Sequence, residues 1–426
     1  MSADRWDVIV VGGGPAGGMA ARTAAGAGLR TLLLEEHPEI GAPAHCSGKL
    51  STHAFAEFEL PHTLARTALR AATLHAPDGS VASVRRDEVD SYVVDRDHFD
   101  RWLAAQAAEA GAEIMLGARA RRATREGGAV AIEAERRGRT LTLRAPVVID
   151  AEGARTLLPA TMGITPRRAL IHGLQYEMAG LRLEADDTPE LYFGREWAPG
   201  FFAWIMPLGG GAGRVGLCID PRLTARPPVY FLDRLMAEHP VTSRRVRGAR
   251  LVRRLVGRIP IIGGRAPSYA PGFLIAGDAA GQVKATSGGG IYFSLLAGRL
   301  AAAAGFAWIG GERLAGRAYE LSWRRRFGRE LRFTTIVRRM LNAMPDPDLS
   351  RLIRAIGTNP LLRRAIEEHG DTQYQSRLLR PVLGQVVRSW REVRLAPAVL
   401  RALLRGLLDA DAEGPPPSAL VAAEKS

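Results

Sequence analysis

The strongest constraint on the fold of this chain is a glycine-rich turn near its start. The apolar run 8–11 predicts a buried parallel strand, and the Ala-rich run 19–27 predicts the helix that follows it. Between them, Gly12 permits a tight turn, Gly14 lets a pyrophosphate approach the backbone, and Gly17 lets the helix lie against the strand. This order of elements predicts a dinucleotide-binding unit.

The residues around this turn complete the expected cofactor site. Free N–H groups at the helix N-terminus, where Ala16 lies, would hold the phosphates. Glu35 ends the next apolar strand, 31–34, at the spacing where an acid accepts a hydrogen bond from an adenosine ribose. Glu36 follows it directly and is a further candidate.

Length and composition narrow the class of protein. A chain of 426 residues exceeds the roughly 100–200 residues of one domain, so two or three domains are expected. Polar residues 2–4 lead directly into the first strand without a signal-like segment, which favours a cytoplasmic protein. The most apolar stretch, 294–310, is interrupted by Arg299 and is shorter than a membrane span of roughly 20 residues, so no transmembrane helix is expected. Cys46 and Cys218 have no metal-ligand spacing, so no metal site is expected.

The net charge of +14 comes almost entirely from arginine, because lysine occurs only at positions 49, 284 and 425. Guanidinium groups suit the phosphate of a cofactor, an anionic lipid or a nucleic acid. No helix-turn-helix, RNP or zinc-finger pattern accompanies the charge, so no nucleic-acid partner is expected. The alternative explanation is a solvated basic surface.

Two later segments repeat the form of the first strand and turn. Residues 147–153 end in Asp150 and Gly153, and residues 273–281 contain Gly277 and Asp278. An acid at the carboxyl end of a strand, followed by small residues and a helix, suits the ribityl and pyrophosphate part of a flavin nucleotide.

A run of glycines, Gly288, Gly289 and Gly290, then opens an apolar helix at Ile291. The N–H groups of that helix could stabilise negative charge on a reduced flavin ring. Cys46 lies in a Gly/Pro-rich loop, 38–49, among small residues that would let a planar ring approach. Its thiol is a candidate proton donor or gate beside a flavin; the alternative is a small buried residue.

Residues 166–256 have a different pattern, in which short strand-like segments are separated by Gly and Pro turns. This pattern predicts an antiparallel sheet inserted into the nucleotide-binding fold. Within it, the aromatic and Met-rich segment 199–207 would either line an apolar substrate tunnel or fill a core.

Residues 313–412 are helical in pattern and rich in arginine, as in a membrane-bound amphipathic helix or a solvated helical cap. The Pro/Ala-rich tail 413–426 is expected to be disordered.

Together these motifs resemble the geranylgeranyl reductase family of FAD enzymes, within the broad group shaped like p-hydroxybenzoate hydroxylase. GGGPAG at 12–17 and RDHFDRWL at 96–103 are shared by the broad group and indicate FAD. The more specific segments are CSG at 46–48, YFG at 192–194, PGFFAWIMP at 199–207 and GDAAGQVKATSGGGIYF at 277–293.

The resemblance implies an α/β fold with a discontinuous, Rossmann-like, three-layer FAD-binding domain at 1–165 and 257–312. An inserted antiparallel substrate sheet would occupy 166–256, with strands of 51–95 partly joined to it, and a helical region would follow at 313–412. The implied cofactor-binding residues are Gly12, Gly14, Ala16, Gly17, Glu35, Glu36, Cys46, Ser47, Gly48, Arg96, Asp150, Gly153, Gly277, Asp278, Gly288, Gly289, Gly290 and Ile291. Arg96 would hold a cofactor phosphate; the alternative is a surface carboxylate.

The chemistry implied by the resemblance is saturation of isolated C=C bonds in a polyprenyl chain, carried by a diphosphate, an isoprenoid lipid, chlorophyll or a quinone. An unactivated alkene has no carbonyl to polarise, so a reduced flavin must contact it in a dry apolar tunnel. Hydride would pass from the flavin, and Cys46 or a nearby water would donate the proton. The implied tunnel residues are Phe201, Phe202, Trp204, Pro207 and Tyr292, with arginines at the mouth for a phosphate head group.

Some features leave alternatives open. Phe202 stands where the family pattern has Tyr, and residues 287–293 also resemble chlorophyll-type reductases.

Electrons would come from NAD(P)H or a ferredoxin-like protein, and the lack of a second GxGxxG unit favours a transient or protein donor. The alternatives are a monooxygenase or halogenase of the same shape, and an electron carrier that reduces a quinone at a membrane surface. A halogenase would carry WxWxIP, whereas this chain has FFAWIMP.

Overall fold

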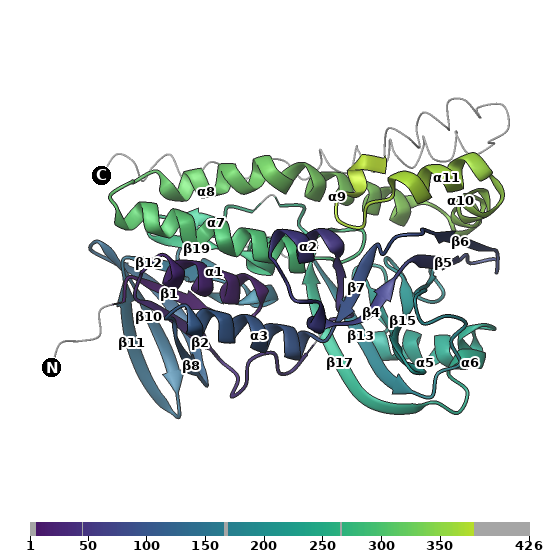
Figure 1. Ribbon diagram of the computed structural model, residues 1–426, viewed down its shortest axis with the longest axis horizontal. Coiled ribbons are helices and arrows are strands. Elements are labelled where there is room, and N and C mark those ends of the chain that lie inside the picture. The colour runs from purple at the N-terminus through teal and green to yellow at the C-terminus, as the bar shows by residue number, and fades with distance from the viewer. Residues whose placement is uncertain (1–5, 45, 166–168, 265, 379–426) are drawn as a thin grey trace.

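The computed structural model describes residues 6–44, 46–165, 169–264 and 266–378. The predicted second half of the helical region, 379–412, and the tail 413–426 lie outside the described residues. Within the described ranges the chain forms two large sheets side by side beneath one layer of helices (Figure 1).

The first sheet has six strands in the order β18-β19-β12-β1-β2-β8, and only the β18–β19 pair is antiparallel. Because parallel neighbours share one direction, the turns after β1, β12 and β19 all lie at the same edge. Its strands are β1 Val8–Val11, β2 Thr31–Glu35, β8 Glu113–Leu116, β12 Val147–Asp150, β18 Tyr269–Ala270 and β19 Phe273–Ile275.

Side-chain alternation along β1 divides the core around the first sheet into two layers. Val8 and Val10 pack with the helices α1 (Pro15–Gly26), α3 (Arg96–Glu109) and α7 (Ile291–Ile309). Ile9 and Val11 pack instead against a three-stranded sheet. The three layers were predicted, and the strands of the outer layer are β9 Ala118–Glu126, β10 Ala129–Arg136 and β11 Arg139–Ala145, with the short helix α4 Leu157–Thr161 beside them.

The second sheet has seven strands in the order β17-β13-β16-β15-β14-β5-β6. Five of its neighbouring pairs are antiparallel as predicted, but β14 and β5 run parallel. β5 comes from a distant part of the chain, so no tight turn joins it to β14 and dictates its direction. The strands are β5 Ala71–His75, β6 Val81–Arg85, β13 Leu170–Ala179, β14 Glu190–Tyr192, β15 Ala203–Gly209, β16 Ala212–Ile219 and β17 Arg250–Pro260; α5 Pro228–Glu238 packs on one face, with α6 Thr242–Arg245 beside it.

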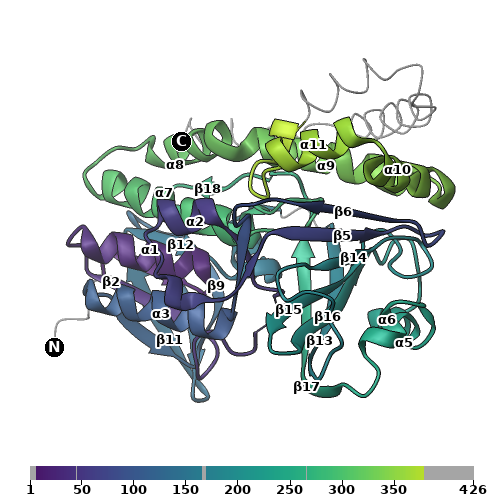
Figure 2. The same cartoon turned by 45° about the vertical axis from the view of Figure 1, so that its right-hand side comes forward.

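A small three-stranded sheet, β3-β7-β4, lies where the two large sheets meet (Figure 1). Above both sheets, the C-terminal helices form a continuous layer, which the turned view in Figure 2 shows spanning the molecule. The remaining elements are β3 Lys49–Ser51, α2 Thr52–Glu57, β4 Ala65–Leu69, β7 Ser91–Val94, α8 Ala315–Trp323, a wide π-helical turn Arg324–Gly328, α9 Arg329–Ala343, α10 Asp346–Thr358 and α11 Pro360–His369.

Helix α7 is longer than the predicted apolar stretch. Among the described residues it alone is long and apolar enough to cross a membrane, judged by length and composition. In this structure 61% of its most apolar window is buried inside the protein, where it packs against α1 and α8. The same composition is typical of the central helix of a folded core.

Candidate active site

The glycine motifs predicted to bind a nucleotide meet at one edge of the first sheet. Gly12 has φ +100°, and a Cβ on it would lie 2.4 Å from the carbonyl oxygen of Ala151. A Cβ on Gly277 would lie 2.9 Å from that of Ala16, and one on Gly290 would lie 3.1 Å from an oxygen of Asp278. The three motifs therefore pack against each other through positions that admit no larger side chain.

Two glycines of the first motif have opposite surroundings. A Cβ on Gly17 would lie 1.8 Å from the carbonyl oxygen of Gly12, so its role is close packing of helix on strand, as predicted. Around the Cβ position of Gly14, by contrast, no atom of the protein lies within 4 Å. Gly14 is the N-cap of α1 and has no side chain to accept a hydrogen bond from the first N–H groups of that helix. The open space and the free N–H groups fit a pyrophosphate.

A buried carboxylate beside this space also fits a nucleotide. Asp150 is fully buried; its Oδ1 accepts the N–H of Glu152 at 3.1 Å, and its Oδ2 has no hydrogen-bond partner among the described residues. Burial raises the pKa of Asp150 well above its usual value, and the charge of Glu152 adds to the rise. Burial likewise raises the pKa of Glu152 to about 7. An unsatisfied buried acceptor at this point is matched by a ligand hydroxyl, such as those of ribose or ribityl groups.

The two adjacent glutamates have different partners. Glu35 accepts the N–H of Gly13 at 2.8 Å and that of His37 at 2.9 Å, so it supports the glycine turn directly. Glu36 pairs with Arg155 at 2.5 Å and Arg119 at 3.4 Å. The predicted cofactor contacts of both residues stay predictions.

The loop that carries Cys46, Ser47 and Gly48 runs to the junction of the two large sheets. Cys46 is half-buried, and the N–H of Gly48 lies 3.4 Å from its Sγ. Arg96, at the start of α3, interacts electrostatically with Cys46 and bonds Asp100 through two nitrogens, at 2.8 and 3.0 Å. Burial alone would lower the pKa of Arg96, but the charges of Asp100 and Cys46 raise it above its ordinary value.

The partner of Arg96 is therefore a carboxylate, that of Asp100, but the pair is buried and does not lie at the surface. Its side chain is only 12% exposed and that of Asp100 only 6%. The pair places a permanently charged guanidinium beside the Cys46 thiol. Positive charge at this distance stabilises a thiolate, the species that remains when Cys46 gives up its proton.

Gln175, on β13 of the second sheet, connects Cys46 to the aromatic segment. Its Nε2 donates to the Cys46 carbonyl at 2.8 Å, and its Oε1 accepts from Trp204 Nε1 at 3.3 Å. Sequence reasoning did not single out Gln175, although a glutamine in a strand with several apolar residues is a usable signal. One buried amide therefore links the candidate proton donor to the candidate substrate surface.

Arg214, on β16, is a second residue that sequence reasoning missed. It is 1% exposed and donates to the carbonyls of Ser47 at 2.8 Å and Val94 at 3.3 Å. It also pairs with Asp95 and, at 3.2 Å, with Glu177. Arg214 therefore ties the second sheet to the Cys46 loop and to β7.

Three predicted tunnel residues form one cluster. The rings of Phe201 and Phe202 stack with centroids 4.5 Å apart, and Phe202 meets Trp204 edge-on at 5.9 Å. Phe201 also packs in a small core with Ile171 and Cys218 of the second sheet. Burial raises the pKa of Cys218 to about 12, so its thiol is neutral near pH 7.

The structure does not bring Pro207 and Tyr292 into this cluster. Strand alternation along β15 places Pro207 on the face of Ala203 and Ile205, which packs toward α5, and not on the face of Trp204. The Tyr292 hydroxyl donates to Glu57 at 2.5 Å on the other side of the site. Their predicted contacts with substrate stay predictions.

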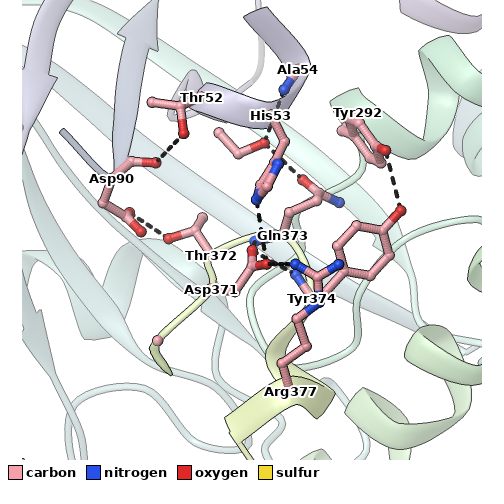
Figure 3. Close-up of polar contacts among 12 residues, drawn as sticks. Thr52, His53, Ala54, Asp90, Tyr292, Asp371, Thr372, Gln373, Tyr374 and Arg377 are labelled. Atoms are coloured by element: carbon pink, nitrogen blue, oxygen red, sulfur yellow. Dashed lines mark hydrogen bonds and ion pairs between the residues drawn. The ribbon is translucent and has the colours of Figure 1, made fainter. Parts of the chain in front are cut away.

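Residues 371–378, which we call the strap, cross the site from the helical layer (Figure 3). Asp371 pairs with His53 at 3.4 Å, and the hydroxyls of Tyr374 and Tyr292 lie 3.1 Å apart. Thr372 bonds Asp90, and its carbonyl accepts a hydrogen bond from Lys284 in the third glycine motif. The strap therefore joins α2, the small sheet and the flavin-type motif at one place.

Two family models match the chain. The FAD-dependent oxidoreductase model covers residues 7–161, and the geranylgeranyl reductase catalytic domain model covers residues 170–257. These ranges correspond to the glycine-motif region and to the strands β13–β17.

Archaeal proteins supply full-length relatives. Digeranylgeranylglycerophospholipid reductase 2 of Methanopyrus kandleri is 35% identical over 84% of this chain and 92% of its own length. The digeranylgeranylglycerophospholipid reductase of Methanocaldococcus jannaschii is 32% identical over 83% of this chain and 91% of its own length.

Solved structures agree on the fold. A geranylgeranyl bacteriochlorophyll reductase-like protein of Thermoplasma acidophilum superposes with a TM-score of 0.81, at 26% identity, and the match covers 93% of this chain and 99% of the other. The flavin-dependent halogenase CmlS reaches a TM-score of 0.66 at 17% identity, over 91% of this chain and 78% of its own, which shows a shared fold alone. This protein is an FAD-dependent oxidoreductase that saturates C=C bonds of polyprenyl chains, and it belongs to the geranylgeranyl reductase family.

Proposed function

We propose that this enzyme saturates the geranylgeranyl chains of a glycerophospholipid. The names of its archaeal relatives support this substrate class. The observation that carries the proposal is the Gln175 link, which holds Cys46 of the FAD-binding region against Trp204 of the catalytic sheet. A proton donor and an apolar aromatic surface are thereby fixed on opposite sides of one buried amide.

Bound FAD would supply the hydride, and we assign the thiol of Cys46 as the source of the proton. Arg96, whose positive charge acts on Cys46, would stabilise the negative charge left on the sulfur after donation. Asp100 fixes the orientation of Arg96 through both of its carboxylate oxygens. Phe201, Phe202 and Trp204 exclude water from the alkene, which has no polar group to orient it.

The test is anaerobic incubation of the FAD-loaded protein with dithionite and a digeranylgeranyl glycerophospholipid, followed by mass spectrometry of the lipid. We expect a gain of one hydrogen pair per reduced bond. Cys46→Ser should lower the rate by about 10²–10⁴-fold, since one positioned proton donor contributes that range. Cys218→Ser is the matched control and should stay active. Flavin that reduces normally while every prenyl substrate stays unchanged would contradict the proposal.

We further propose that the enzyme works at the cytoplasmic surface of a membrane and receives electrons from NAD(P)H or a ferredoxin-like protein. A lipid with long prenyl chains stays in a bilayer, and the net charge of +14 favours an anionic leaflet. Sedimentation with vesicles should show binding to anionic lipid that salt reverses. Anaerobic flavin bleaching by NADPH, NADH or reduced ferredoxin identifies the donor.

A further inference from the structure

Arg338, on α9, is a buried arginine that forms no ion pair with an acidic side chain among the described residues. It is 6% exposed, and its Nη2 has no hydrogen-bond partner among the described residues. Burial lowers its pKa to about 10, and the charge of Asp220 opposes that shift, so the group stays protonated near pH 7. A buried guanidinium left in this state costs folding free energy unless something binds it.

Asp220, the acid whose charge acts on Arg338, already has another partner. Asp220 accepts hydrogen bonds from Nε of Arg222 at 3.0 Å and from Nη2 of Arg222 at 2.7 Å. Arg338 instead lies over the ring of Phe201, with its guanidinium carbon 4.1 Å from the ring centroid. This contact favours a cation but provides no hydrogen-bond acceptor for Nη2, which stays without a partner among the described residues.

The position of Arg338 belongs to the active site. The ring of Phe201 reaches the third glycine motif, where its Cζ would lie 3.9 Å from a Cβ on Gly288. The charges of Arg338 and Cys46 both act on the buried thiol of Cys218. Arg338 therefore lies on the same Phe201 ring that stacks on Phe202 of the aromatic cluster and meets Gly288 of the third glycine motif.

We propose that Arg338 binds the phosphate group of the isoprenoid substrate, an inference that rests on the proposed function. Two oxygens of a phosphate ester can accept both arms of a guanidinium fork, and the negative charge of the phosphate compensates the positive charge of Arg338. The prenyl chain attached to that phosphate would run along Phe201 toward Cys46. Arg338 therefore sets how far along the chain the reacting double bond lies.

The experiment compares ligands that differ only in the phosphate. Calorimetric titration of the FAD-loaded protein uses geranylgeranyl diphosphate, a digeranylgeranyl glycerophospholipid and the uncharged geranylgeraniol. Arg338→Met should raise the Kd of the phosphate-bearing ligands by about 10- to 100-fold, the range for a lost charge-assisted bond, and leave geranylgeraniol within about twofold. The larger loss identifies the source of the phosphate, a lipid head group or a prenyl diphosphate.

Controls separate binding from folding. Arg332→Met changes an exposed arginine of the same helix and should alter no Kd. Arg338→Met should melt at or above the wild-type temperature, because it removes an uncompensated buried charge and keeps a long apolar stem on Phe201. Arg338→Lys should retain most of the preference for phosphate.

Two results would overturn the inference: equal weakening of geranylgeraniol binding, or unchanged binding of both phosphate-bearing ligands. Wild-type protein that binds these ligands with the expected Arg338 dependence but never reduces them would instead reject the proposed function and leave the phosphate site standing. The two failures are thus distinguishable.

Discussion

The edge of the first sheet and the seam around Arg214 are packed in opposite ways. At the edge, Gly12 and Gly17 bring backbone against backbone, Gly277 lies against the Cβ of Ala16, and an added Cβ would overlap these neighbours. At the seam, one long charged side chain crosses between segments and bonds two carbonyls and two carboxylates. The first arrangement depends on the absence of side chains, and the second depends on one side chain that cannot be replaced by an apolar residue of similar size.

The largest expected effect is at the seam. Arg214→Met removes one partner from each of two carboxylates, so that Asp95 keeps only Arg66 and Glu177 keeps only Arg253. We therefore expect a loss of about 3 kcal/mol in unfolding free energy, measured by urea denaturation. Arg66→Met is the matched control, because Arg66 is 41% exposed and pairs with the same Asp95. That exposed pair should contribute about 0–1 kcal/mol. Equal losses in the two variants would show that the buried pairs of Arg214 contribute no more to stability than the exposed pair of Arg66.

The next effect tests the glycine edge. Gly17→Ala places a methyl group 1.8 Å from the Gly12 carbonyl, and we expect a loss of about 1–3 kcal/mol together with weaker FAD retention. Gly26→Ala in the same helix meets no atom within 4 Å and should stabilise the protein by about 0.4–1 kcal/mol. Thermal melting and flavin absorbance after gel filtration measure both. A harmless Gly17→Ala would show that the edge tolerates side chains.

A smaller effect concerns pH. The folded-state pKa of Glu152, about 7, lies above its unfolded value of 4.5, so the folded state binds the extra proton between these values. Its contribution to stability is fully present below pH 4.5 and is lost as the pH rises through about 7. Relative to Glu152→Gln, the wild-type melting temperature of the flavin-free protein should therefore fall across this window. Parallel curves for the two proteins would exclude a raised pKa at Glu152.

The smallest effect is expected in the strap. Tyr374→Phe removes the hydroxyl that lies 3.1 Å from that of Tyr292 and should cost about 0.5–1.5 kcal/mol. Tyr230→Phe, at an exposed position, is the control and should change little. Hydrogen exchange of residues 371–378 would report the loss locally. Unchanged exchange at residues 371–378 would mean that the other strap contacts hold this segment in place without the Tyr374 hydroxyl.

Most of the nucleotide-binding fold was predictable because its signals are local. Gly12, Gly14 and Gly17 each follow from a backbone requirement within one strand, turn and helix. The three-layer order was implied by the family resemblance, because the four residues of β1 are all apolar and do not distinguish its two faces. The parallel β14–β5 pair could not be predicted, since it joins segments more than a hundred residues apart.

The substrate side was less predictable because its contacts span the chain. Arg214 had a signal, an arginine within the apolar run 212–219, but its four partners lie in three different segments. Arg338 recurs at helical spacing with Leu331 and Thr334, which places it on the buried face of α9. Composition alone made it one of many arginines expected to face solvent or lipid.

The strap also has a consequence for the order of biosynthesis. Its partners His53 and Asp90 leave the ribosome more than 280 residues before Thr372 does. Until residues 371–378 emerge, α2 and the small sheet can fold only with this side uncovered. During translation, the strap contacts can therefore form only after the helical layer has been synthesised.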